Sequence, residues 1–179
     1  MPFDRKLGES VGLAIDYLVD AIGDASCTLR RAIIMLDIDA NPETTQSAII
    51  ERLGYEKSMV SRNIEWLADH GVIVRFPCAQ DARETRLQLV AFARTSINHA
   101  LRTIKKDHSH MIALLKSLHE SFSVHKPSLR DIKILCVVTT YGKMSRQQIR
   151  EQLYNGSLAT YNRAIANLIE EGLIQENDG

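Results

Sequence analysis

The fold is decided by residues 45–90, which read TQSAIIERLGYEKSMVSRNIEWLADHGVIVRFPCAQDARETRLQLV. This stretch begins with a short helical segment that Thr45 opens and Gly54 closes. A longer helical segment follows over residues 57–70 and ends before a glycine. The apolar side chains of the longer segment are spaced four and three apart, as on the buried face of a helix: Val60, Ile64 and Leu67.

The chain then changes period. Residues 72–76 are β-branched and aromatic, residues 87–90 form a second candidate strand, and a polar segment joins the two. This pattern predicts a β-hairpin with a long charged tip. A helix over residues 29–38, capped by Thr28, precedes the stretch. Helix, short helix, turn, longer helix and hairpin is the order of a winged helix-turn-helix.

In such a unit the second helix of the turn pair can enter a DNA major groove, and the hairpin, or wing, can reach the neighbouring backbone or minor groove. The face of segment 57–70 opposite the apolar stripe carries short hydroxyls and an arginine, which suit phosphate contacts and hydrogen bonds to base edges. A solvated surface is the alternative interpretation. We predict major-groove contacts for Ser58, Ser61, Arg62 and Asn63, and contacts to phosphates or the minor groove for Lys57, Arg83 and Arg86.

Both of these elements resemble the MarR family of bacterial transcriptional regulators. EKSMVSR, residues 56–62, is similar to the family's recognition-helix opening, and DARETRLQL, residues 81–89, is similar to its wing signature. Over residues 8–122 the resemblance implies an obligate homodimer, in which the first helix and the long helix after the wing pack between subunits. It also implies two recognition helices on a pseudo-palindromic operator, with Arg83 and Arg86 near the DNA backbone or minor groove. Met59 stands where the family usually has threonine, so base specificity is not carried over.

Beyond the wing, residues 92–122 contain neither glycine nor proline. This predicts one long helix, which serves as a linker or as a dimerisation element. After Pro127 the first half recurs, with Thr28-Leu29-Arg30 repeated as Ser128-Leu129-Arg130. Further matches lie 100 residues apart, or 101 after a single slip: Ile34 and Ile134, Thr45 and Ser145, Ile49 and Ile149, Glu51 and Glu151, Leu53 and Leu153, then Arg62 and Arg163, Ile64 and Ile165, Leu67 and Leu168, Gly71 and Gly172, Ile73 and Ile174. This favours duplication over the alternative of one irregular helical domain.

We therefore predict a mainly α fold with tandem winged helix-turn-helix modules. Residues 1–122 form a MarR-like domain with dimerisation helices, and residues 127–179 form a second winged-helix-like domain. Seven residues follow Gly172, so the second wing is expected to be truncated. The second module is either another DNA reader or a packing and partner module. As a DNA reader it would use Ser157, Thr160, Tyr161 and Arg163.

Charge separates the two modules. The whole chain of 179 residues has 22 basic and 22 acidic residues, which excludes a polybasic protein that holds nucleic acid by bulk charge. Residues 43–106 hold ten basic and seven acidic residues, a balance of +3, whereas residues 128–179 hold six of each. The first module is therefore the expected DNA reader.

Other classes of function find little support. The three cysteines are too scattered for a disulfide framework or a four-ligand zinc site, and no metal or cofactor is expected. Cys27 could be a redox-sensing thiol, although a half-buried structural cysteine is the favoured interpretation. No phosphate loop, nucleophile elbow or metalloprotease helix occurs, so no enzyme is expected. No signal peptide and no apolar run of roughly 18 residues is found, which predicts a cytoplasmic protein without a membrane span.

The sequence thus predicts a homodimeric transcriptional regulator that binds double-stranded DNA at a specific operator. The first alternative is a protein-interaction scaffold of winged helices that binds no DNA. A sensor with an apolar pocket for a small-molecule effector, between the long helix and the first module, is a further alternative.

Overall fold

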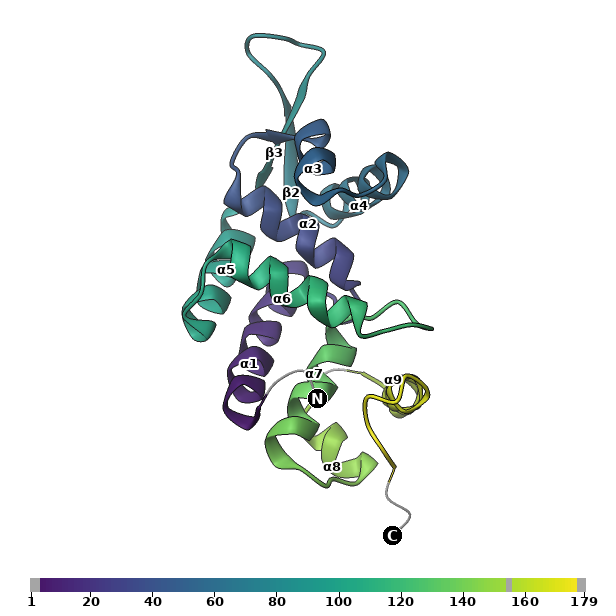
Figure 1. The fold of residues 1–179 in the computed structure, drawn as a ribbon. Coiled ribbons are helices and arrows are strands. Elements are labelled where there is room, and N and C mark those ends of the chain that lie inside the picture. The colour runs from purple at the N-terminus through teal and green to yellow at the C-terminus, as the bar shows by residue number, and fades with distance from the viewer. Residues whose placement is uncertain (1–3, 154–155, 177–179) are drawn as a thin grey trace.

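A computed structural model describes residues 4–153 and 156–176. The described part is mainly helical with one small sheet, as the sequence predicts (Figure 1). In chain order the elements are α1 (Arg5–Ile22), α2 (Leu29–Ala40), β1 (Thr44–Thr45), α3 (Gln46–Leu53), α4 (Lys57–Asp69), β2 (Ile73–Pro77), β3 (Thr85–Leu89), α5 (Ala91–Ile104), α6 (His108–Glu120), α7 (Leu129–Tyr141), α8 (Arg146–Glu151) and α9 (Leu158–Glu170).

Helices α2, α3 and α4 form the predicted helix-turn-helix. Thr45 caps α3, because its hydroxyl accepts a hydrogen bond of 3.2 Å from the backbone N–H of Ala48. Gly54 ends α3 with a φ of 68°, in the left-handed region that glycine enters at little cost. Arg52 of α3 pairs with the buried Asp37 of α2 at 2.7 Å and so fixes the angle between these helices. The apolar stripe of α4 is buried, as predicted.

The wing is a hairpin of β2 and β3, and both strands are antiparallel neighbours in a sheet of order β1-β3-β2. Ile73 pairs with Leu89 at the base of the hairpin, and Pro77 pairs with Thr85 toward its tip. Strand β1 contributes only two residues, Thr44 opposite Leu87 and Thr45 opposite Arg86, and the sequence did not predict it. The short third strand anchors the wing to the start of α3.

The prediction of one long helix over residues 92–122 is wrong, because the structure divides this segment into α5 and α6. Lys105 takes a left-handed φ of 54° between them, and the Asp107 carboxylate accepts a hydrogen bond from the His110 backbone N–H, which caps a new helix. Helix α6 turns back and packs against α2. At that contact His108 Nε2 lies 2.6 Å from Oδ2 of Asp39, whose side chain is buried.

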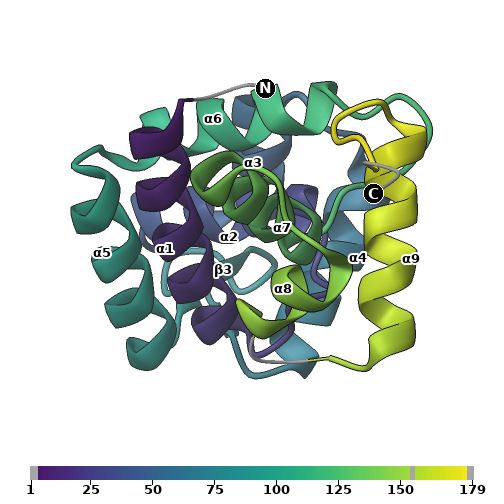
Figure 2. The same ribbon diagram turned by 90° about the horizontal axis from the view of Figure 1, so that it is seen from below.

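Helix α1 lies between α5 and α7, and it packs closely against both (Figures 1 and 2). Lys133 of α7 donates to Asp16 Oδ2 at 2.7 Å and to the Gly12 carbonyl at 3.1 Å, which ties α7 to α1. Helices α8 and α9 pack on α7 and lie at the end of the molecule opposite the wing (Figure 1). Within the described ranges, none of the helices has the length and apolar character needed to cross a bilayer.

Candidate nucleic-acid interface

The solvent-facing side of α4 carries four of the predicted contact residues. Lys57, Ser58, Ser61 and Arg62 are all exposed, and Glu65 lies on the same side. The opposite side is held in the core by the predicted stripe, in which Val60 and Leu67 have no exposed surface. We call the four residues Lys57, Ser58, Ser61 and Arg62 the α4 surface. They present hydroxyls, an ammonium group and a guanidinium from the first turns of one helix.

Asn63 does not belong to this surface, which corrects the prediction that it contacts bases. It is buried, its Oδ1 accepts a hydrogen bond of 3.0 Å from Arg31 Nε, and its Nδ2 donates to the Met59 carbonyl at 2.9 Å. The Arg31 guanidinium also lies over the Trp66 ring, 3.9 Å from its centroid. Asn63 therefore joins α4 to α2 and holds the α4 surface in place.

The two predicted wing arginines occupy different positions. Arg83 is exposed near the tip, where its backbone N–H donates to the Asp81 carboxylate at 2.9 Å. Arg86 is half-buried and donates to the Glu43 carbonyl at 3.1 Å and to Glu84 Oε2 at 2.9 Å. Arg86 thus joins the wing to the loop before β1, whereas Arg83 is placed to reach a ligand.

A groove of about 270 Å³ separates α4 from the wing. Its polar lining includes Ser61 and Glu65 of α4, Arg75 of β2 and Thr85 of β3. Arg75 is exposed and was missed by the sequence analysis. Strand alternation could not have found it, because Arg75 lies two residues after the buried Ile73 and so on the same face of β2. The available signal was a basic residue within a strand of the predicted wing.

A second cavity, of about 260 Å³, has four cationic side chains around it: Arg30, Arg31, Arg62 and Lys126. We call these four residues the junction cluster, because they come from α2, from α4 and from the segment before α7. None of the described residues that line this cavity is acidic. His119 also lines it, and burial together with the nearby Arg30 lowers the pKa of His119. The cluster is a concentrated positive charge beside the α4 surface, which suits phosphate groups.

The residues predicted to bind DNA in the second module lie on α9 or cap it. As among the predicted residues of α4, some of them are exposed and one is buried. Ser157 and Arg163 are exposed and Thr160 is half-buried. Tyr161 is only 2% exposed, and its hydroxyl donates to the Leu153 carbonyl at 3.3 Å. The prediction that Tyr161 contacts DNA is therefore wrong, because its ring fills the space between α9 and the chain after α8.

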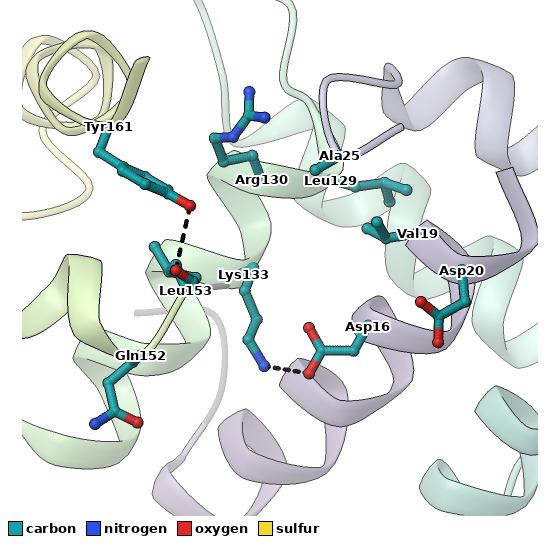
Figure 3. Close-up of a pocket in the computed structure, with 10 residues that line it drawn as sticks. All are labelled: Asp16, Val19, Asp20, Ala25, Leu129, Arg130, Lys133, Gln152, Leu153 and Tyr161. Atoms are coloured by element: carbon teal, nitrogen blue, oxygen red, sulfur yellow. Dashed lines mark hydrogen bonds and ion pairs between the residues drawn. The ribbon is translucent and has the colours of Figure 1, made fainter. Parts of the chain in front are cut away.

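A further cavity of about 280 Å³ lies where α1, α7 and the chain around α8 and α9 meet (Figure 3). Figure 3 shows the Lys133–Asp16 ion pair on one side of it and the Tyr161–Leu153 hydrogen bond on the other. Arg130 lines the cavity, and its buried Nε makes no hydrogen bond within the described residues. The volume of this cavity lies just below the range of drug-sized ligand pockets, about 300 to 1,000 Å³.

The thiols do not support a redox role for Cys27. Burial raises the pKa of Cys27 to about 12, and burial also raises the pKa of Cys136 to about 12. Both thiols are therefore protonated and inert at neutral pH. In the part of the chain that the structure describes, no cluster of His, Cys, Asp and Glu side chains could hold a metal ion.

Comparison with known proteins finds a family match over part of the chain. Residues 28–85, from the cap of α2 to the start of β3, match the MarR family. No curated protein matches the chain.

Similar solved structures cover about three fifths of this chain. RV1404 from Mycobacterium tuberculosis has 16% identity and a TM-score of 0.44, over 60% of this chain and 69% of that chain. A mutant of MarR from E. coli complexed with operator DNA has 16% identity and a TM-score of 0.43, over 63% of this chain and 84% of that chain. The transcriptional repressor CouR bound to a 23-mer DNA duplex has 22% identity and a TM-score of 0.41, over 59% and 81%.

Proposed function

We propose that this chain, whose residues 28–85 match the MarR family, is a transcriptional regulator that binds specific sites on double-stranded DNA with α4 and the wing. The observation that carries the proposal is the exposure of the α4 surface, which lies within the segment that matches the family, beside the junction cluster. Arg62 belongs to both, so one guanidinium connects the base-facing helix with the positive charge beside it.

In the proposed complex the first turns of α4 enter the major groove. Ser58 and Ser61 donate to or accept from base edges and phosphates, and Arg62 suits bidentate contact with a guanine edge. Lys57 and Arg83 contact phosphates on either side, and they contribute affinity without sequence preference. Occupation of an operator in this way regulates transcription by competition with polymerase.

The resemblance to the MarR family implies a homodimer on a pseudo-palindromic operator. In that homodimer, a partner subunit supplies the second recognition helix. Such a dimer would bury the large apolar side chains that α1 and α5 leave exposed: Leu7, Leu13 and Phe92. Sedimentation of the free protein tests this part of the proposal. Twice the chain mass supports the homodimer, and the mass of one chain contradicts it.

The proposed DNA contact is tested by gel-shift titration on random and genomic duplexes over a range of salt. We expect Arg62→Ala to weaken binding to a selected site by about 1–3 kcal/mol while leaving random DNA less affected. The matched control is Arg102→Ala, which removes the same charge from an exposed position on α5, on the other side of the molecule (Figure 1). Equal losses on the selected and the random duplex would contradict base reading by Arg62. Absence of any binding at low salt would favour the protein-interaction scaffold instead.

A further inference from the structure

A cavity of about 490 Å³ lies between α7, α8 and α9, at the end of the molecule opposite the wing (Figure 1). This volume falls within the range of ligand-binding pockets, about 300 to 1,000 Å³. No aromatic ring is found among the described residues of its lining, so the cavity suits an aliphatic group rather than a flat ring that needs stacking. The apolar side chains of the lining are all aliphatic and come from the three helices and the segments beside them: Val138, Met144, Ile149, Ile165, Ile169 and Ile174.

An ion pair lies beside these aliphatic side chains. Arg146 of α8 donates to the Glu176 carboxylate through Nε at 2.7 Å and through Nη2 at 2.9 Å. This is the bidentate geometry in which a guanidinium binds a carboxylate. Among the described residues of the lining, Glu176 is the only acidic one, whereas the exposed Lys143 adds a second cation. The cavity therefore combines an aliphatic lining with a guanidinium that already holds a carboxylate.

The Glu176 carboxylate can be replaced at little cost. The side chains of Arg146 and Glu176 keep 39% and 53% of their surface exposed, and water screens the attraction between charges at such exposure. Ile174, two residues before Glu176, is buried and holds the segment after α9 in place. Glu176 can therefore leave Arg146 while the segment stays attached. A carboxylate that also buries an aliphatic chain has an advantage over Glu176, because the chain removes apolar surface from water.

We propose that this cavity binds a small aliphatic carboxylate, whose chain packs among the aliphatic side chains and whose carboxylate takes the place of Glu176 on Arg146. In the free protein Glu176 occupies the position of the ligand's carboxylate, so the two compete for one guanidinium. The site lies in the second half of the chain, outside residues 28–85 that match the family. It differs from the pocket expected between the long helix and the first module, and it does not depend on DNA binding by α4.

Isothermal titration calorimetry of the full chain with octanoate, in the absence of DNA, tests the proposal. We expect one octanoate to bind per chain, and no binding of octylamine, which has the same chain and the opposite charge. From butanoate through hexanoate to octanoate, the affinity should rise about fourfold for each added methylene. Absence of octanoate binding at millimolar concentrations, or equal binding of octylamine, would overturn the proposal and leave the proposed DNA binding untouched.

Two variants that break the same ion pair should change the affinity for octanoate in opposite directions. Arg146→Gln removes the group that binds the ligand's carboxylate, so binding should weaken at least about tenfold. Glu176→Gln removes the competitor, so binding should tighten by up to about fivefold. The matched control Arg163→Gln removes a charge from an exposed position on α9 outside the lining, and it should leave the affinity unchanged.

The opposite signs separate competition from a purely structural role of the ion pair. If the pair only held the segment after α9 in place, both variants would loosen that segment and shift the affinity for octanoate in the same direction. A shift in the same direction, or an affinity that neither variant changes, would overturn the assignment. Because Glu176→Gln retains Arg146, its affinity tests the competition even if Arg146→Gln fails to fold, and weaker binding by Glu176→Gln would then contradict the proposal.

Discussion

At the scale of single residues, the three cysteines lie in environments that separate their reactivities. Backbone hydrogen bonds from Gln80 and Asp81, and then the neighbouring Arg86, lower the pKa of Cys78 on the wing. Burial raises the pKa of Cys27 and of Cys136 to about 12. A lower pKa gives more thiolate, which is the form that reacts with alkylating reagents.

We therefore expect iodoacetamide at neutral pH to modify Cys78 in the folded protein orders of magnitude faster than Cys27 or Cys136. Mass spectrometry of timed digests measures the three rates. In guanidinium chloride the rates should become similar, which provides the control for reagent access. Modification of Cys27 as fast as Cys78 in the folded state would contradict the described burial.

The side chains on α4 show which residue roles a sequence can predict. The exposed positions 57, 58, 61 and 62 follow from the apolar stripe alone. Asn63 lies three residues after Val60 and four before Leu67, so helical spacing already places it on the buried side. We nevertheless predicted a base contact for Asn63, because its side chain is polar. Its partner Arg31, 32 residues away, could not be predicted, because local spacing says nothing about contacts between distant segments.

At the scale of elements, the helices with clear caps were predictable and the break in the post-wing segment was not. Thr28, Thr45 and Ser128 each cap a helix as their types suggest. Between α5 and α6 no glycine or proline marks the break. Lys105 instead takes a positive φ that costs a non-glycine residue some strain, and burial of Met111, Leu115 and Leu118 on α6 is available only after the chain turns. Tertiary packing overrides the local helix preference here.

A prediction at the scale of elements concerns the contact between the wing and DNA. Arg83 near its exposed tip is positioned to contact a phosphate, so Arg83→Ala should reduce the slope of log affinity against log salt by about 1, uniformly across sequences. Arg86 is unsuitable for this test because its removal would also free the wing from the Glu43 carbonyl. Titrations at several salt concentrations give the slope, with Arg102→Ala as the control of equal charge. An unchanged slope for Arg83→Ala would argue against contact between the wing and DNA.

At the scale of the whole molecule, the neutral net charge is an average over unlike surfaces. The junction cluster gathers four cations from three separate segments, and composition alone could not reveal it. The apolar side of α1, which includes Val11, Ile15 and Leu18, was equally ambiguous, because an apolar face is the same whether it packs against a partner subunit or against its own chain. In the structure α5 and α7 cover much of that face. Folding of the second half onto α1 therefore places α8 and α9 at the end of the molecule opposite the wing (Figure 1).

The attachment of α9 depends on Glu171, just after its last turn. The Glu171 carboxylate accepts hydrogen bonds from the backbone N–H groups of Ser123, Val124 and His125, at 2.7, 2.8 and 2.6 Å. Burial alone would raise the pKa of Glu171, but these hydrogen bonds outweigh it and lower the pKa to about 2. A carboxylate whose pKa is lowered on folding stabilises the fold above its unfolded value, near 4.3, and that stabilisation disappears as the pH falls toward 2.

Glu171→Gln should therefore unfold at a lower urea concentration than the wild type at pH 7, and the difference should narrow between about pH 5 and pH 2. Glu9→Gln, at an exposed position on α1, controls for the loss of one carboxylate. A wild-type advantage of equal size at pH 7 and pH 2 would show that the ionised carboxylate is not what stabilises the attachment. Because the same three N–H groups lie in the segment that links α6 to α7, loss of the carboxylate should also loosen α9 against the rest of the chain. Faster amide hydrogen exchange at residues 123–125 in Glu171→Gln at pH 7 would report that loosening directly.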